Sequence, residues 1–194
     1  MFGRREFPCF DAVSAAAACV ERQAALLQNL AEYAAPEAAA HTRRRMQGLA
    51  AAAHRDWREL NERLSRQFVT AVEREDVSAL VREMAEWTAQ TAALAVTWQA
   101  SPPASAAAWA GRLASGGKAL RALIEELPRL WQDNALADRA EALCTLRRDA
   151  DAAFEQEARR LHETALAPVA AAHACCVALA RLADTAEWLA LKNR

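Results

Sequence analysis

The chain has 194 residues, a formal net charge of −1 and five cysteines. This length is enough for one domain with a sizeable core, and the near-zero charge gives no electrostatic case for nucleic-acid binding. No apolar run approaches the roughly 20 residues of a membrane span, and the early charges disfavour a signal peptide, so we expect a cytoplasmic protein. We expect reduced, mostly buried thiols, because adjacent Cys175 and Cys176 are poorly placed to bridge each other.

Alanine makes up about a quarter of the residues, far above ordinary usage, whereas Gly, Pro and β-branched residues are sparse. This composition is typical of long helices that pack closely through small side chains. No alternating strand pattern competes with the helical periodicity, so the predicted fold class is all-α.

Two helices are predicted in the first third of the chain. The first spans Asp11 to about Tyr33, and the second runs from Pro36, which suits a first helical position, to about Gln67. Apolar residues recur at steps of three and four, which places one apolar stripe, or seam, along each helix; this seam is expected to face the core. The predicted inward residues are Val13, Ala17, Val20, Ala24, Leu27 and Ala31 in the first helix, and Met46, Leu49, Ala53, Trp57, Leu60 and Leu64 in the second.

The segment 68–80, FVTAVEREDVSAL, is predicted to be a tight corner followed by the third helix. Its β-branched start suits an extended corner, and Asp76 is predicted to be the helix N-cap. The cluster Glu73-Arg74-Glu75-Asp76 favours a structural corner over an active site. Inward positions of the third helix are Val77, Leu80, Met84, Trp87, Thr91, Leu94 and Trp98, and the helix is expected to stop at Ser101-Pro102-Pro103.

Three further helices are predicted. The first starts near Ala104 and is ended or bent by Pro128, the second runs from about Asn134 to Thr164, and the third starts at Pro168. Gly116-Gly117 indicates a kink or a close crossing within the first of them. Trp109 and Trp131 lie near one end of the bundle, where they could anchor a partner or, as we favour, cap the core. The predicted inward residues are Trp109, Leu113, Leu120, Leu123 and Leu127, then Leu136, Ala140, Leu143, Leu146, Ala150 and Phe154, then Cys175, Leu179, Leu182, Ala186 and Leu189.

An internal repeat relates the two halves of the chain. A displacement of 97 residues puts Met46 on Leu143 and Trp57 on Phe154. It also puts the corner residues 69–72 on residues 166–169. We therefore predict a single domain, 1–194, made of two three-helix halves at about 10–101 and 104–193.

Three separate segments resemble one known family. The corner matches F-[IV]-T-P-[IV]-x-R-E-D-[IV]-x-x-L at Phe68, Thr70, Val72, Arg74, Glu75, Asp76, Val77 and Leu80, with Ala71 in place of the usual Pro. The opening MFGRR is similar to MFGRK, and residues 183–192 are similar to A-D-x-x-E-x-[IV]-x-L-K. The chain thus resembles the PhoU-like phosphate transport regulators, distant PhoU homologues also called domain-of-unknown-function family 47. The resemblance implies an elongated bundle of six long helices in two three-helix repeats.

The resemblance also implies a place for metal ions, because PhoU-like proteins bind iron or zinc clusters through E/D-x-x-x-D pairs on their helices. Here those positions hold Ala50 and His54, Ala85 or Glu86 and Ala89, Arg147 and Asp151, and Val177 and Arg181. Only His54, Glu86 and Asp151 could ligate, and the arginines would repel a cation. We therefore expect degenerate motifs, no bound metal and no cofactor.

Other chemistry finds little support in the residues. His173 and Cys176, three apart, could hold a soft metal, although a buried face is the favoured interpretation. There is no G-x-S-x-G nucleophile elbow, and Gly116-Gly117-Lys118 lacks the rest of a phosphate-binding loop. No Glu-x-x-His pair occurs, which argues against a carboxylate-bridged metal enzyme. We expect a protein that is not an enzyme.

The first functional hypothesis follows from the resemblance: a cytoplasmic accessory protein that docks on a low-affinity inorganic phosphate (Pit-type) transporter and modulates uptake. Arg74, Glu75 and Asp76 are the predicted docking residues, chosen for their charge and expected exposure. Attachment to the inner membrane would then be peripheral, through the partner. The alternative is a helical scaffold or oligomeric adaptor without a transporter link, and homo-oligomerisation remains open.

Overall fold

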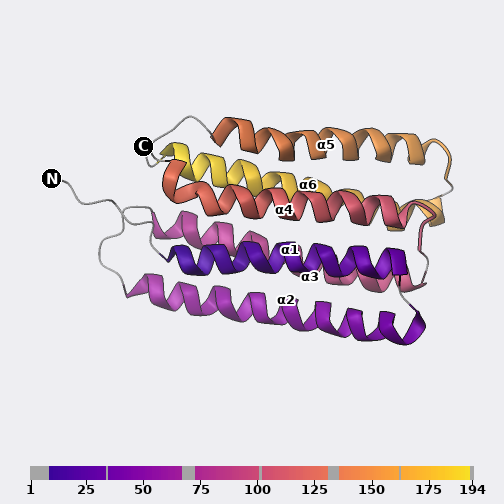
Figure 1. The fold of residues 1–194 in the computed structure, drawn as a ribbon, viewed down its shortest axis with the longest axis horizontal. Helices are drawn as coiled ribbons and strands as arrows, with labels where there is room; N and C mark the ends of the chain where they lie inside the picture. The colour runs from indigo at the N-terminus through magenta and orange to yellow at the C-terminus, as the bar shows by residue number, and fades with distance from the viewer. Residues whose placement is uncertain are drawn as a thin grey trace.

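The computed structural model describes residues 9–33, 35–66, 73–100, 102–130, 136–161 and 163–192. Within these ranges the chain forms six α-helices and no strand, as the composition predicts. They are α1 (Phe10–Tyr33), α2 (Pro36–Ser65), α3 (Arg74–Ala100), α4 (Ala106–Leu130), α5 (Leu136–Ala158) and α6 (Glu163–Lys192). The longest, α2 and α6, have 30 residues each, and the bundle is elongated along their length (Figure 1).

The helices lie roughly side by side, with α2 and α5 on opposite outer sides and the other four between them (Figure 1). The contact pattern is symmetric. In the first half α1, α2 and α3 all touch one another, and α4, α5 and α6 do the same in the second half. The halves meet through α1 against α4 and α3 against α6. Two equivalent three-helix units joined across two antiparallel pairs would produce this pattern.

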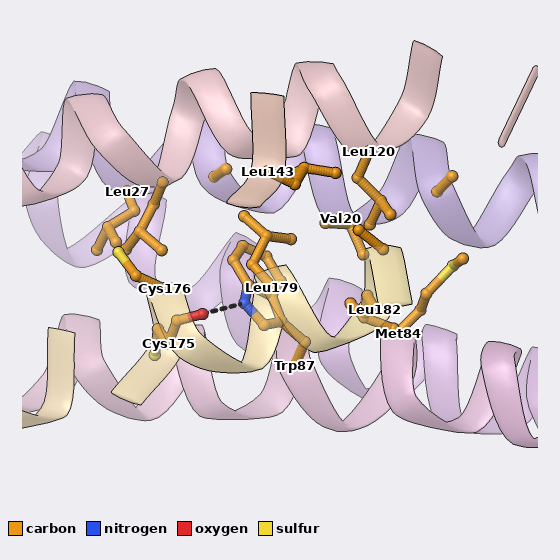
Figure 2. Close-up of a cluster of buried hydrophobic side chains, with 14 of the residues drawn as sticks. Val20, Leu27, Met84, Trp87, Leu120, Leu143, Cys175, Cys176, Leu179 and Leu182 are labelled. Carbon is orange, nitrogen blue, oxygen red and sulfur yellow. Dashed lines mark hydrogen bonds between the residues drawn. The ribbon is translucent and has the colours of Figure 1, made fainter. Parts of the chain in front are cut away.

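The core lies along the predicted seams. Every predicted inward residue of α3 is buried, and so is every one of α4 and α6. In the described parts of α1, α2 and α5 the exceptions are only half-buried: Ala31, Leu49, Trp57 and Phe154. Figure 2 shows labelled side chains of α1, α3, α4, α5 and α6 in one cluster. In this cluster, Trp87 of α3 donates a hydrogen bond from Nε1 to the Cys175 carbonyl of α6 at 2.9 Å.

Gly117 allows α1 and α4 to approach closely. A Cβ at this position would lie 3.2 Å from Ala24 Cβ and 3.3 Å from the Glu21 Cα, closer than almost any real side-chain contact. Of the two predicted readings of the Gly-Gly pair, the close crossing is therefore confirmed.

Helix boundaries differ from prediction in the second half. α6 begins at Glu163 and contains Pro168, so the predicted start at Pro168 is wrong. Pro168 therefore lies inside the helix, where its missing N–H removes one backbone hydrogen bond and its ring crowds the carbonyl of residue 164. The predicted fifth helix is too long, because α5 ends at Ala158 and a turn follows. Pro128 does not end α4, which continues to Leu130.

The apolar content of α6 exceeds the expectation from sequence. Its segment Leu166–Leu189 has a mean hydropathy of 1.7 and is long and apolar enough to cross a membrane, so the expectation that no segment approaches this length is wrong. About half of that segment is buried inside the bundle, against α3, α4 and α5. A helix that packs against three neighbours needs apolar residues on several faces, which accounts for the composition.

Candidate functional site

The charged corner lies at one end of the bundle, where α2 ends and α3 begins (Figure 1). The extended segment predicted at 68–72 falls outside the described residues. α3 begins at Arg74, so the prediction of Asp76 as N-cap is wrong: the backbone N–H groups of Asp76 and Val77 donate to the Glu73 carbonyl at 3.2 and 3.3 Å. Asp76 instead lies in the first turn, where a carboxylate complements the positive end of the helix dipole.

Lys192, the last residue of α6, joins this corner. Its Nζ lies 3.0 Å from Asp76 Oδ2 and also bonds Glu73, while its ammonium sits 4.5 Å from the centre of the Trp188 ring. The hydrogen bond that Lys192 donates to Glu73, followed by the one that it donates to Asp76, raises the pKa of Lys192. Two of the three segments that carry the family resemblance, the described part of the corner at 73–80 and the closing segment 183–192, therefore meet in space.

The three predicted docking residues share one end of the bundle but differ in exposure. Glu75 is exposed, whereas Asp76 is half-buried under Lys192. Arg74 is also half-buried and donates to the Leu64 carbonyl at 3.4 Å, near the end of α2. Beside them an open hollow of about 310 Å³ is lined by Arg74, Glu75 and polar side chains of α2 and α3, including Asn61.

Sequence reasoning did not single out Trp188 for this end. Its side chain is 50% exposed, which is unusual for tryptophan, and it packs beside Lys192. The sequence did indicate that Trp188 is exposed. It directly precedes the inward Leu189, so its side chain points away from the buried face of α6.

The three residual metal candidates lie apart. His54 is on α2 and Asp151 is on α5, the two outermost helices (Figure 1). Glu86 is on α3, where Oε1 lies 3.6 Å from Arg82 Nε and the side chain lines a groove beside Arg181 of α6. The described residues contain no group of three or more His, Cys, Asp or Glu side chains positioned to hold a metal ion.

Asp151 is already engaged with neighbouring groups. Its Oδ1 lies 2.6 Å from Nε2 of His173, and its Oδ2 lies 4.0 Å from Nε of Arg147. A guanidinium at this position repels a cation. His173 and Cys176 are the candidates for a soft metal. The thiol of Cys176 is buried, and burial raises its pKa to about 12. The residues present therefore do not fit the metal cluster that the fold family implies.

His173, which pairs with Asp151, also contacts a group of aromatic and charged side chains in the second half. The His173 ring stacks on Phe154 with centroids 4.6 Å apart and meets the edge of Trp109 at 6.4 Å. Trp109 donates from Nε1 to Glu157 Oε1 at 3.0 Å, and the Arg112 guanidinium lies 5.0 Å from the Trp109 ring centre. We call Trp109, Arg112, Phe154, Glu157 and His173 the Trp109 cluster.

The Trp109 cluster decides between two predictions. Trp109 is fully buried, so the core-capping role is confirmed and the surface-anchor role is wrong. Trp131 lies outside the described residues. Cysteine placement is mixed, because Cys175 and Cys176 are buried, Cys9 and Cys19 are half-buried and Cys144 is exposed. The expectation of mostly buried thiols is therefore only partly met.

Comparison with known proteins shows which solved structures share this fold. No protein-family model matches the chain, and no curated protein matches it by sequence. Two solved structures from Shewanella oneidensis MR-1 match over 94% of this chain and 99% of their own, each at 15% identity. One is a PhoU-like protein, with a TM-score of 0.75, and the other is described as a PhoU-like phosphate regulatory protein, with a TM-score of 0.67.

The architecture is therefore that of an all-α, six-helix bundle. More particularly, the chain has the PhoU-like fold along nearly its whole length.

Proposed function

We propose that this protein is a non-enzymatic accessory protein of inorganic phosphate transport that works in the cytoplasm without a resident metal or cofactor. The observation that carries the proposal is the near-complete structural match to PhoU-like proteins, one of which is described as a phosphate regulatory protein. The sequence resemblance also supports it, and two of its three segments, the corner and the closing segment, meet through Lys192.

In this proposal the chain docks on the cytoplasmic side of a Pit-type transporter through the end formed by Arg74, Glu75 and Asp76. The end offers an exposed carboxylate at Glu75, a hollow beside it and a half-exposed tryptophan at Trp188. Tryptophan and arginine are enriched at protein interfaces, and this end carries Trp188 and Arg74. Attachment to the membrane is peripheral and depends on the partner.

A pull-down with the Pit-type transporter of the same cell tests the docking end. Glu75→Lys changes only an exposed side chain, and the triple variant Arg74→Glu, Glu75→Lys, Asp76→Lys reverses the charge of all three. We expect the single variant to reduce retention and the triple variant to abolish it. Arg44→Glu is the matched control, because Arg44 is exposed near the opposite end of α2.

Two outcomes would count against the proposal. Full retention by both corner variants would remove the corner from the interface. Failure of the wild-type chain to bind the transporter, together with self-association in sedimentation analysis, would favour the oligomeric adaptor. Thermal unfolding of each variant separates loss of binding from loss of fold, since Arg74 and Asp76 are half-buried.

A further inference from the structure

The two halves differ at two pairs of equivalent positions near the start of their first helices. The 97-residue displacement pairs Ala12 of α1 with Trp109 of α4, and Ala15 with Arg112. In the second half, the Trp109 indole is fully buried between α4, α5 and α6, and the half-buried Arg112 places its guanidinium 5.0 Å from the Trp109 ring centre, beside an open hollow between α4 and α5. In the first half, the same positions carry only methyl groups.

A cavity of about 220 Å³ is present where those large side chains are missing. It lies between α1, α2 and α3 and is lined by both Ala12 and Ala15. Leu60 of α2 lines it too, and the displacement pairs Leu60 with Glu157, the acceptor of the Trp109 indole N–H. We call this space the α1–α2–α3 cavity.

The walls of the α1–α2–α3 cavity are apolar. They come from alanines of α1 and α2 together with Leu60, Val81 and Met84, of which the last three are almost completely buried. Cys19 also lines the space, and burial raises the pKa of its thiol. A surface of this kind favours a flat hydrocarbon body over a polar one.

The rim of the cavity is negatively charged. Asp11, Asp56, Glu59 and Arg63 line it, and Arg63 Nη2 is 3.4 Å from Asp11 Oδ2, so that pair neutralises itself. Among the described residues no ion pair engages Asp56 or Glu59. Two carboxylates at the mouth of an apolar pocket attract a cation and repel an anion.

We propose that the α1–α2–α3 cavity binds a small organic cation with a flat apolar body, of the arylalkylamine class. The apolar walls receive the ring, and Asp56 and Glu59 receive the ammonium group. The second half carries a ring and a cation at the equivalent positions as part of the chain, Trp109 and Arg112, whereas Ala153 and Gln156 stand where the first half has Asp56 and Glu59. The volume is below the roughly 300–1,000 Å³ of sites for drug-sized molecules, which restricts the ligand to about one bicyclic ring and a short amine.

Methionine methyl NMR can test this proposal directly with tryptamine as the probe. Met84 lines the cavity, whereas Met46 is fully buried and does not line it, so Met46 is an internal control. We expect tryptamine to shift the Met84 methyl signal saturably and to leave Met46 unchanged. Indole-3-acetate has the same ring and the opposite charge, and we expect it to bind at least tenfold more weakly.

Two variants test the two parts of the site. Ala12→Trp places the ring found in the second half into the cavity, and we expect it to abolish tryptamine binding. The exposed pair Asp56→Lys, Glu59→Lys leaves the walls intact, so it should fold normally, weaken tryptamine at least tenfold and strengthen indole-3-acetate. This second variant keeps the test valid if Ala12→Trp does not fold.

The proposal is overturned by any of three results. These are no saturable Met84 shift at millimolar tryptamine, equal affinity for tryptamine and indole-3-acetate, or unchanged tryptamine affinity in the Asp56→Lys, Glu59→Lys variant. None of them bears on transporter docking, because the cavity and the docking corner are lined by different residues.

Discussion

The ammonium of Lys192 lies 3.0 Å from Asp76 Oδ2, and this ion pair joins residues 116 positions apart in the chain. It connects the last turn of α6 to the first turn of α3, and Glu73 shares the same ammonium. The end of the bundle that we propose as a docking surface is therefore held together by both halves.

Lys192→Met should lower the thermal midpoint by a few degrees, because it leaves Asp76, only 16% exposed, without its cation. The control is Arg159→Met, which removes a highly exposed pair with Glu155 and should have almost no effect. Thermal unfolding followed by circular dichroism measures both. Equal midpoints for Lys192→Met and wild type would show that the ion pair contributes nothing to stability.

The same ion pair sets an alkaline pH dependence. The pKa of Lys192 is raised above 10.5 in the folded protein, first by Glu73 and then by Asp76. A raised lysine pKa stabilises the fold fully below about pH 10.5 and loses that contribution as the pH rises through the folded value. The difference between wild type and Lys192→Met should therefore be constant from neutral pH to about pH 10 and shrink above it. A difference that vanished below pH 9 would contradict this assignment.

Gly117→Val should destabilise the protein by about 1–3 kcal/mol, because the new side chain would push α1 away from α4. Gly48→Ala is the contrasting change. A Cβ at Gly48 meets nothing within 4 Å, and Ala in a helix interior should add about 0.5–1 kcal/mol. Urea unfolding measures both free energies. A Gly117→Val protein as stable as wild type would mean that the helices separate at little cost.

Alkylation should distinguish the cysteines by burial. Burial raises the pKa of Cys175 and of Cys176 to about 12, so only about one thiol in 10,000 would be ionised at pH 8. Cys144 is exposed and should react with iodoacetamide at least a hundredfold faster. Peptide mass spectrometry gives the rate at each site, and urea should equalise the rates. Similar rates in the folded protein would show that α6 opens readily.

Elemental analysis of protein purified without chelator or affinity tag should find only substoichiometric iron and zinc. We expect this because Arg147 and His173 engage Asp151 and the three residual candidates lie apart. Added chelator should leave the thermal midpoint unchanged. Near-stoichiometric metal would instead mean that the ligands lie at positions other than His54, Glu86 and Asp151.

The sequence by itself was enough to predict the all-α class, six helices and their inward faces. Helical periodicity records which side of each helix is buried, so Val13, Ala17, Val20, Ala24 and Leu27 could be assigned to the core before any contact was known. Helix ends were less certain, because one favourable residue such as Asp76 or Pro168 competes with tertiary contacts that select a start several residues earlier.

Only the tertiary structure decided which residues meet. Spacing along α6 related His173 to Cys176, whereas the fold pairs His173 with Asp151 of α5. It also brought Lys192 to Asp76, and it left the α1–α2–α3 cavity at Ala12 while Trp109 filled the equivalent place. Periodicity fixes the direction of a side chain around its own helix, but a site depends on the relative height and rotation of neighbouring helices, which are set by packing over the whole bundle.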